Sequence, residues 1–268
     1  MRFYRDIIAD LDKPAEKVKY RYHQWSPESI KFYWDVCTNN PLIRSQFYPT
    51  EYWEDLLAWA YQRIPTTPLT VVDIGCGNGN LIECVSKIYK DARIYGVDLS
   101  EQSLEAAKER FRKSQNIQFK VGSLNQLPFE DSSVDLITCT EVLEHTFPET
   151  FTRSFFEISR VLKKGGYYLA SIPFDEKINV VCCPECGSVF APYQHMIFEI
   201  THTGISSLLS ENGLELIQFY TSLDRSHPSN PAKRMLKPIV IKWLPGLAQR
   251  IFSKGGVSGF LARATTEH

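Results

Sequence analysis

The sequence predicts an α/β fold in which a mostly parallel sheet carries helices on both faces. Residues 67 to 223 alternate short apolar, β-branched runs with amphipathic stretches, which is the pattern of strands alternating with helices. A glycine-rich turn, with Gly75, Gly77 and Gly79, follows the first of these strands. Ligands of open α/β sheets bind at the carboxyl edge, so we expect the site at this turn.

The first strand is expected over residues 70 to 74, because this run is short and β-branched, as a buried parallel strand should be. Glycine in the following turn lets the backbone bend sharply and approach a ligand closely, because it has no Cβ. The next helix directs free N–H groups and its positive dipole end at the turn. We therefore expect an anionic or polar ligand, with Asp73 ordering the turn or meeting the ligand.

The spacing of the glycines bears on the class of nucleoside cofactor. The dinucleotide fingerprint G-x-G-x-x-G requires glycine at position 80, where the chain has Asn80. The order here is Asp-x-Gly-x-Gly-x-Gly, beginning at Asp73. A second strand over residues 93 to 97 ends in Asp98, whose carboxylate can accept hydrogen bonds from both ribose hydroxyls of either cofactor.

Later segments narrow the choice of cofactor. Further strands are expected over residues 117–122, 135–140 and 167–172, with a helix that runs to the glycines at 165 and 166 before the last of them. A Leu-Pro-Phe turn follows the third strand. Taken in order, these motifs resemble the class I S-adenosylmethionine-dependent methyltransferases, including the O-methyltransferases of ubiquinone biosynthesis. The resemblance covers about residues 50 to 223.

The resemblance implies a Rossmann-like sheet of seven strands, mostly parallel, that ends in an antiparallel pair at 214–223 and 257–264. It implies S-adenosylmethionine as cofactor and methyl transfer to a small-molecule acceptor, for which we expect an oxygen atom. Ser123 stands where this family usually carries Asp, so adenine contacts are expected from its hydroxyl and the Leu124 backbone, with weaker affinity. The expected cofactor-binding residues are Asp73, Gly75, Cys76, Gly77, Asp98, Leu99, Ser123, Leu124 and Glu141.

The methyl group of a sulfonium is already activated, so the protein must mainly position a nucleophile and exclude water. A hydroxyl acceptor also needs a base. His145 is the first candidate for that catalytic role and His195 the second, because imidazole titrates near neutral pH. An ordinary structural histidine remains the alternative for each of them.

Two groups of residues have the spacing of metal ligands. Cys183 and Cys186 form a Cys-x-x-Cys-Gly knuckle of the kind that presents two thiolates to a structural zinc, with His195 as a candidate third ligand. A turn with reduced or redox-active cysteines is the alternative. Glu144 and His145, at i+3 and i+4 from Glu141 on an expected helix, resemble the magnesium cluster of small-RNA terminal 2′-O-methyltransferases, again with His195 to complete it.

Many methyltransferases similar to this chain carry the same five-residue Glu-x-x-Glu-His run without a metal. The favoured alternative is that Glu141 lies beside the cofactor while Glu144 and His145 shape the floor of the substrate site or cap the helix. We therefore expect magnesium less than zinc, and expect His195 to serve at most one of the two sites. If zinc binds, a structural role is favoured, because methyl transfer needs no Lewis acid at sulfur.

The length, composition, net charge and cysteine count of the chain limit the classes of function that it can have. With 268 residues, 43% of them hydrophobic, it can bury one large core or one core plus an appended module. A net charge of −1 disfavours a nucleic-acid partner. Seven cysteines, an odd number, fit reduced thiols, and neither a bilayer-spanning run nor a signal-peptide core is visible, so we expect a cytoplasmic protein.

We expect a helical, aromatic-rich N-terminal lid over residues 1–66 and a methyltransferase domain over 67–268, with a Cys-rich loop at 174–200. A basic amphipathic helical insertion is expected at 224–256. Its segment 231–254 is expected to cap the sheet edge, with contact to an anionic membrane surface as the alternative. The rival functions are a nicotinamide-dependent oxidoreductase, an enzyme for a lipid-linked or RNA acceptor, and a noncatalytic cofactor-binding protein.

Overall fold

The computed structural model describes residues 1–3, 21–40, 50–174, 176, 179–191, 194–221 and 258–266. The strands of its central sheet are β3 (Thr70–Ile74), β4 (Arg93–Asp98), β5 (Ile117–Val121), β6 (Val134–Thr140), β7 (Leu162–Ile172), β11 (Leu214–Thr221) and β12 (Ser258–Ala264). The helices are α2 (Pro27–Asn39), α4 (Thr50–Tyr61), α5 (Asn80–Ile88), α6 (Glu101–Arg110), α7 (Pro148–Val161) and α8 (His202–Glu211), with a 3-10 turn, η1, at Leu143–His145.

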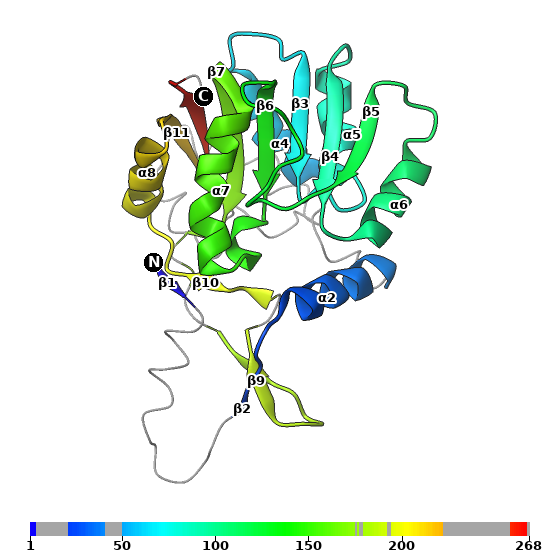
Figure 1. The fold of residues 1–268 in the computed structure, drawn as a ribbon, viewed down its shortest axis with the longest axis vertical. Helices are drawn as coiled ribbons and strands as arrows, with labels where there is room; N and C mark the ends of the chain where they lie inside the picture. Colours follow the sequence, from blue (N-terminus) through cyan, green and yellow to red (C-terminus); the bar gives the residue numbers. More distant parts are fainter. Residues whose placement is uncertain are drawn as a thin grey trace, which may run out of the picture.

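The seven strands lie in the order β11-β12-β7-β6-β3-β4-β5 (Figure 1). Strand β12 runs antiparallel to both of its neighbours, and β7, β6, β3, β4 and β5 are parallel to one another. The predicted fold class, including the antiparallel pair at the end, is confirmed. Because the chain leaves β3 for β4 on one side and later returns to β6 on the other, β3 marks the switch point where such sheets bind ligands.

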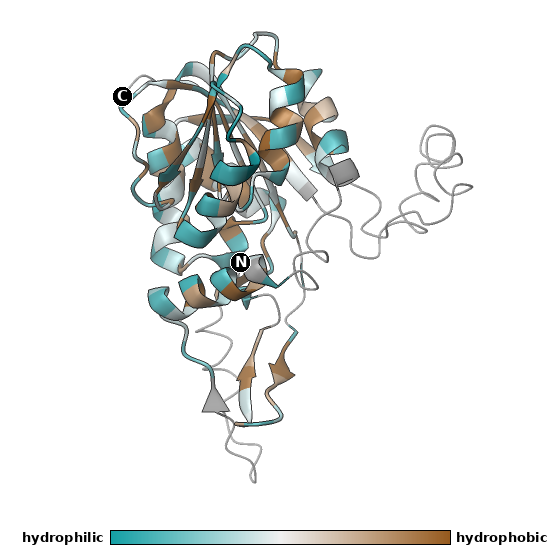
Figure 2. Ribbon diagram, turned by 90° about the vertical axis from the view of Figure 1, so that its right-hand side faces the viewer, coloured by the Kyte–Doolittle hydropathy of each residue, from teal (hydrophilic) through white to brown (hydrophobic). Residues whose placement is uncertain are grey.

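Helices cover both faces of the sheet. One core joins α4, α5 and α6 to the sheet, and the other joins α7 and α8 to its opposite face. Figure 1 shows α7 and α8 in front of the strands and α4 and α5 behind them. The apolar strands at the centre and the hydrophilic outer sides of the helices are visible in Figure 2. Burying a β-branched sheet between two amphipathic layers is the main stabilising term of this architecture.

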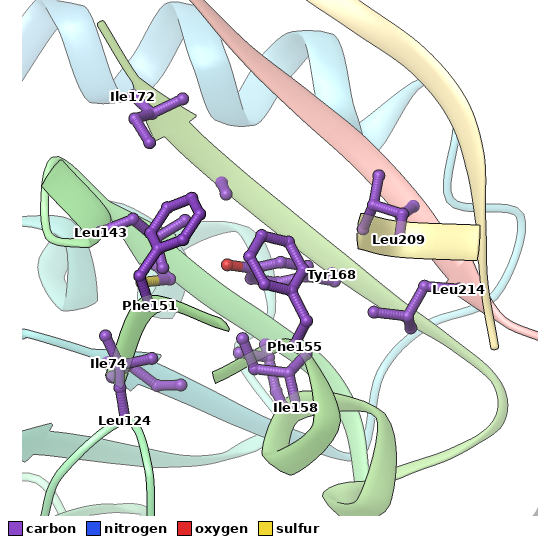
Figure 3. Close-up of a cluster of buried hydrophobic side chains, with 14 of the residues drawn as sticks. Ile74, Leu124, Leu143, Phe151, Phe155, Ile158, Tyr168, Ile172, Leu209 and Leu214 are labelled. Atoms are coloured by element: carbon purple, nitrogen blue, oxygen red, sulfur yellow. The ribbon is translucent and has the colours of Figure 1, made fainter. Parts of the chain in front are cut away.

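Aromatic rings fill the core under α7. Phe151 and Phe155, which are four residues apart and therefore on one face of the helix, have ring centroids 5.5 Å apart. The centroid of the Phe155 ring lies 6.5 Å from that of Tyr168 on β7 (Figure 3). The ring of Tyr168 lies 5.3 Å from that of Phe260 on β12. All four rings are fully buried, so they join α7 to the strands behind it.

Small sheets and one helix lie beyond the carboxyl edge of the main sheet. Strand β2 (Arg21–Tyr22) pairs with β9 (Ser188–Phe190), which forms a hairpin with β8 (Val181–Cys182). Strand β1 (Arg2–Phe3) pairs with β10 (Ile197–Phe198). Figure 1 shows α2 beneath the lower edge of the main sheet, and both views show the hairpin projecting below α2.

Two details differ from the sequence prediction. Helix α7 ends at Val161, four residues before the first of the two glycines expected to end it, and β7 begins at Leu162. The residues between Leu162 and Tyr167 are accommodated by an irregular register against β6, and Gly165 takes a φ of +81° there. The region expected to be wholly helical contains β1 and β2, and its helix α4 packs in the core with α5. The insertion predicted at 224–256 lies outside the described residues.

Replacement of Phe155 by Ala should lower the free energy of unfolding by about 3–5 kcal/mol, because it leaves a cavity between α7 and β7. The adjacent Phe156 is 47% exposed, so Phe156→Ala should cost less than about 1 kcal/mol. Urea unfolding followed by circular dichroism measures both values. Equal losses in the two variants would contradict the packing described for α7.

Candidate functional site

A cavity of about 250 Å³ lies at the carboxyl edge of the sheet. Its walls include the segments that follow β3 (73–78), β4 (98–100), β5 (122–124) and β6 (140–142). Helix α2 supplies the opposite wall with Ile30, Lys31, Trp34, Cys37 and Thr38, and α4 adds Trp53. The cavity is therefore at the predicted position, and both the sheet and the N-terminal region form it.

The glycine turn has a backbone that glycine adopts readily, because Gly75, Gly77 and Gly79 have φ of +69°, +51° and +84°. A Cβ on Gly75 would clash with Cγ2 of Val142. A Cβ on Gly79 would lie 2.5 Å from the ring of Phe111. A Cβ on Gly77 would meet no atom of the described residues within 4 Å. Packing thus requires glycine at positions 75 and 79, whereas at Gly77, which lines the cavity as Gly75 does, space for a Cβ remains.

The carboxylate of Asp98 holds this turn against the end of β4. Its Oδ2 accepts a hydrogen bond from the N–H of Gly77 at 2.8 Å, and its Oδ1 accepts one from the N–H of Ser100 at 2.8 Å. Burial raises the pKa of Asp98, and these backbone donors oppose that effect by stabilising the charge. The Ser100 hydroxyl donates to Asp35 of α2 at 2.5 Å. Asp98, the residue predicted to bind the ribose, therefore lines the cavity. Directly and through Ser100, it also connects the glycine turn, the start of α6 and helix α2.

Asp73 is almost fully buried beneath the turn, and its Oδ1 accepts a hydrogen bond from the Thr138 hydroxyl at 2.7 Å. Burial raises the pKa of Asp73 to about 7, the Thr138 hydrogen bond opposes this, and the nearby charge of Asp98 adds to it. Near neutral pH the group is therefore close to its midpoint. A cationic ligand beside it would favour the charged form.

The other residues predicted to bind the cofactor line the same cavity: Cys76, Leu99, Ser123, Leu124 and Glu141. Burial raises the pKa of Cys76 well above its ordinary value, so the side chain is a neutral thiol. Ser123 and Leu124 follow β5, as predicted for residues that face a base. The structure brings all nine predicted residues together around one cavity.

The segment after β6 is not the α-helix predicted from residue 141. Glu141 has a φ of +54°, and its carboxylate accepts a hydrogen bond from the Ser171 hydroxyl at 2.9 Å. Leu143–His145 then form a single 3-10 turn. The predicted helical face with Glu141, Glu144 and His145 is therefore wrong. His145 nevertheless lines the cavity.

His195, the second predicted base, lies behind His145 and not in the cavity wall. The two imidazole centroids are 4.9 Å apart, and each ring is less than 10% exposed. Nδ1 of His195 lies 2.6 Å from Oε2 of Glu176. The ligand atoms of Glu144, His145 and His195 all lie within 4.8 Å of one another. Within the described parts of the chain, this is the single group of three or more His, Cys, Asp or Glu side chains arranged for a metal.

The structure does not bring Cys183 and Cys186 together with His195. The two cysteines lie in the turn between β8 and β9, where the N–H of Cys183 donates to Ser188 O at 2.8 Å and the N–H of Gly187 donates to Cys183 O at 2.9 Å. Strand β9 then leads away from this turn, and His195 follows near η1. The short separation of nine residues between Cys186 and His195 in the sequence therefore does not bring their side chains together in the fold. The predicted ligand set of Cys183, Cys186 and His195 is not assembled.

Three residues at this end of the cavity were missed by sequence reasoning. The indole N–H of Trp34 donates to Oε1 of Gln194 at 3.0 Å, and the Gln194 amide donates to His145 O at 2.8 Å. The Trp34 ring lies 4.9 Å from that of His145. Glu176 is the third residue. The adjacency of Gln194 and His195 and the abundance of N-terminal aromatics were the available signals, but neither indicates a partner across the fold.

Residues 72–170 match a family described as the methyltransferase domain. An uncharacterized methyltransferase of Schizosaccharomyces pombe is 30% identical over 129 residues, which cover 45% of this chain and 41% of that protein. Demethylmenaquinone methyltransferase of Lactococcus lactis is 28% identical over 179 residues, which cover 66% of this chain and 65% of that protein. The chain thus aligns with less than two thirds of the length of either relative.

A solved structure of a methyltransferase from Methanosarcina mazei described as S-adenosylmethionine-dependent superposes with a TM-score of 0.57 at 18% identity, covering 78% of this chain and 98% of that one. This likeness supports the fold. Strand order, the glycine turn and the position of the cavity are typical of α/β domains that bind a nucleoside cofactor. More particularly, residues 72–170 match the methyltransferase-domain family, in agreement with the predicted resemblance to the class I S-adenosylmethionine-dependent methyltransferases.

Two alanine substitutions in the glycine turn should separate stability from binding. Gly75→Ala should lower the free energy of unfolding by about 2–4 kcal/mol, because its Cβ meets Val142 in a left-handed backbone. Gly77→Ala should cost about 1 kcal/mol, since only the backbone conformation opposes it, yet should abolish binding of S-adenosylhomocysteine. Urea unfolding and calorimetry measure the two effects. Full binding by Gly77→Ala would show that this glycine does not face the ligand.

The raised pKa of Asp73 predicts that stability falls as pH rises from about 4 to 7. In this window the unfolded chain, in which the pKa is near 4, has lost the proton that the folded chain retains, so the free energy of unfolding decreases by on the order of 1 kcal/mol per pH unit. Above pH 7 this contribution is constant. Unfolding of the native protein and of Asp73→Asn at several pH values isolates it. If the free energies of unfolding of the native protein and of Asp73→Asn changed in parallel with pH, the raised pKa of Asp73 would be refuted.

Proposed function

We propose that the protein transfers a methyl group from S-adenosylmethionine to a hydroxyl of a small-molecule acceptor. The observation that carries this proposal is one cavity that is lined both by the whole set of predicted cofactor residues and by His145. S-adenosylmethionine supplies an activated methyl group on sulfur, so the remaining task of the protein is positioning and exclusion of water.

The residues fit the parts of this donor. Asp98 has lone pairs beyond those used by the two backbone donors, and they can accept bonds from ribose hydroxyls. Ser123 and Leu124 follow β5 at the position proposed for adenine. Gly77 offers close approach beside Asp73, whose pKa of about 7 suits a neighbouring cationic group. These are the contacts we assign to nucleoside and methionine parts of the donor.

The part of the cavity around His145, which we assign to the acceptor, is lined mainly by apolar and aromatic side chains. Ile30 and Trp34 of α2 and Trp53 of α4 face the same cavity as Val142 and His145. Such walls suit a flat or apolar molecule that carries a hydroxyl. His145 is the polar group that we propose to take the hydroxyl proton as the oxygen–carbon bond forms. The imidazole of His195 packs behind the imidazole of His145, with their centroids 4.9 Å apart.

Helix α2 is the part of the predicted lid that we propose to cover bound ligands. Three side chains of α2 form hydrogen bonds across the cavity. Thr38 Oγ1 lies 2.8 Å from Ser103 Oγ of α6, and Asp35 accepts a hydrogen bond from the Ser100 hydroxyl. On the other side, the indole N–H of Trp34 donates to Gln194. The helix therefore contacts both sides of the cavity. The boundary at residue 66 and a membrane role of 231–254 remain predictions.

Structural zinc at Cys183 and Cys186 also remains a prediction, supported by the hydrogen-bonded turn that carries them. A cytoplasmic location is likewise an expectation. Among the helices that the structure describes, none has the length and apolarity to cross a membrane.

The proposal is tested by calorimetry with S-adenosylmethionine and S-adenosylhomocysteine, followed by a metabolite screen with a labelled methyl donor. We expect binding of one donor per chain and label in a hydroxylated small molecule. Asp98→Ala should weaken binding by at least about tenfold, because hydrogen bonds to a charged group are worth about 1.5–3 kcal/mol. Asp91→Ala is the control, since this exposed acid precedes β4 at the opposite edge of the sheet.

Failure to bind either nucleoside would overturn the proposal, and binding of a nicotinamide dinucleotide instead would favour an oxidoreductase. Donor binding with no transfer to any metabolite would favour the noncatalytic alternative. Label appearing in RNA or in a lipid-linked molecule would contradict the small-molecule acceptor while preserving the activity.

A further inference from the structure

We propose that Gln194 is a positioning residue for the acceptor part of the cavity. The two ends of its side-chain amide bind Trp34 of α2 and the turn that carries His145, and so hold an aromatic wall and the proposed base in one arrangement. Trp34 and His145 both line the cavity, whereas Gln194 is fully buried and is not part of its wall. This inference rests on the proposed function and names a further residue for the same reaction.

The chemistry of the two partners requires an amide between them. The indole N–H of Trp34 can only donate a hydrogen bond, and the main-chain carbonyl of His145 can only accept one. Gln194 satisfies both, because its Oε1 accepts from Trp34 at 3.0 Å and its Nε2 donates to His145 O at 2.8 Å. A charged carboxylate would present only acceptors, and an ammonium only donors. The partners therefore determine both the residue type and the direction of the amide.

The backbone at Gln194 is held in a conformation that residues with a Cβ rarely adopt. Its φ is +60°, in the left-handed region. The N–H of Gln194 donates to Ala191 O at 3.3 Å. On the other side, the N–H of Met196 donates to Glu144 O at 2.7 Å. Strained backbone of this kind persists only where the surrounding structure holds it, and it is common at functional sites. The fold thus maintains the strain at the residue whose amide joins the two partners.

Gln194 also contacts the imidazole itself. Its main-chain O lies 3.5 Å from Nδ1 of His145. The centroid of the Trp34 ring lies 4.9 Å from that of the same imidazole, with an angle of 74° between the rings. The ring of His195 packs against this imidazole as well, with the centroids 4.9 Å apart. The position of the proposed base is therefore set by its neighbours in the fold, and Gln194 links it to α2. Without the amide, the separation between the base and the aromatic wall would no longer be fixed.

A glutamine that only stabilises the fold is the alternative. Gln194 is 0% exposed, so its replacement should lower stability under either interpretation. The two interpretations differ in what happens at the cavity of the folded variant. A purely stabilising role leaves the rings of Trp34 and His145 in place, whereas a positioning role predicts that they separate.

Gln194→Met tests the proposal in the full-length chain, because methionine has a similar length and lacks the amide. Nuclear magnetic resonance of protein labelled at tryptophan and histidine follows the two rings, with signals assigned from Trp34→Phe and His145→Gln. We expect nuclear Overhauser effects between the rings of Trp34 and His145 in the unsubstituted protein and their loss in Gln194→Met. Exchange of the Trp34 indole N–H with solvent should become about tenfold faster, as expected for the loss of one hydrogen bond.

Methyl transfer supplies the second measurement. With the labelled donor and the hydroxylated metabolite that the screen identifies, Gln194→Met should lower kcat/KM by at least about tenfold, because a misplacement of about 1 Å can cost about a hundredfold. Its affinity for S-adenosylhomocysteine should stay within about twofold, since the hydrogen bonds that the structure describes for Gln194 go to residues outside the proposed donor site. Gln118→Met is the matched control, because the same substitution at an exposed glutamine of β5 should change none of these quantities.

Two further variants keep the test decisive. Gln194→Asn retains an amide with a shorter reach and repeats both measurements if Gln194→Met does not fold. Trp34→Phe removes the indole N–H and keeps an aromatic ring. Combined with Gln194→Met, it should lower kcat/KM by less than the product of the two single effects, because both substitutions remove the same hydrogen bond.

The outcomes separate this inference from the proposed function. A folded Gln194→Met or Gln194→Asn variant that keeps the Overhauser effects between the rings and the parent kcat/KM would overturn the proposal. Fully independent effects of Trp34→Phe and Gln194→Met on kcat/KM would overturn it as well. Failure of the unsubstituted protein to bind S-adenosylhomocysteine would instead refute the proposed function. The ring contacts in Gln194→Met would then still show whether Gln194 positions the two side chains.

Discussion

The carboxylate of Asp98 is the contact on which the site depends. One of its oxygens accepts the N–H of Gly77 and the other accepts the N–H of Ser100, so a single side chain fixes the glycine turn, the end of β4 and the start of α6. Ser100 extends this network to Asp35 on α2. Because buried hydrogen bonds to a charged group are strong, movement of any one of these segments is opposed by the others. The position that we propose for the ribose is therefore next to the bonds that hold the walls of the cavity together.

The sheet and the cofactor end of the cavity could be predicted because their determinants are local. A buried parallel strand is a short β-branched run whose end is marked by a glycine or an acid, and β3 occupies the residues predicted for it. Once the strand order is known, the residues at the carboxyl ends must meet at one edge. That geometric rule brings Asp98, Ser123 and Glu141 together although they are far apart in sequence. It needs no knowledge of side-chain packing.

The acceptor end could not be predicted in the same way, because it depends on long-range contacts. The segment after β6 has a helical pattern in sequence, but Glu141 takes a left-handed backbone that its bond to Ser171 helps to stabilise, and only a short 3-10 turn follows. His195 is placed by the chain after β9, where Met196 bonds to Glu144. The prediction that His195 joins Cys183 and Cys186 in a zinc site, which relied on its distance from Cys186 in the sequence, was therefore wrong. Sequence spacing is informative only within one regular element.

The two ends of the cavity share α2, and this links the ordering of one to the other. Asp35 and Thr38 contact the segment that follows Asp98, while Trp34, on the same helix, contacts Gln194 and His145. Residues one and four positions apart on a helix are held at fixed separations by its backbone. The contacts of Asp35 and Thr38 on one side and of Trp34 on the other therefore hold α2 in one common orientation. A change that displaced the helix at either set of contacts would strain the other set, because the backbone between them is rigid.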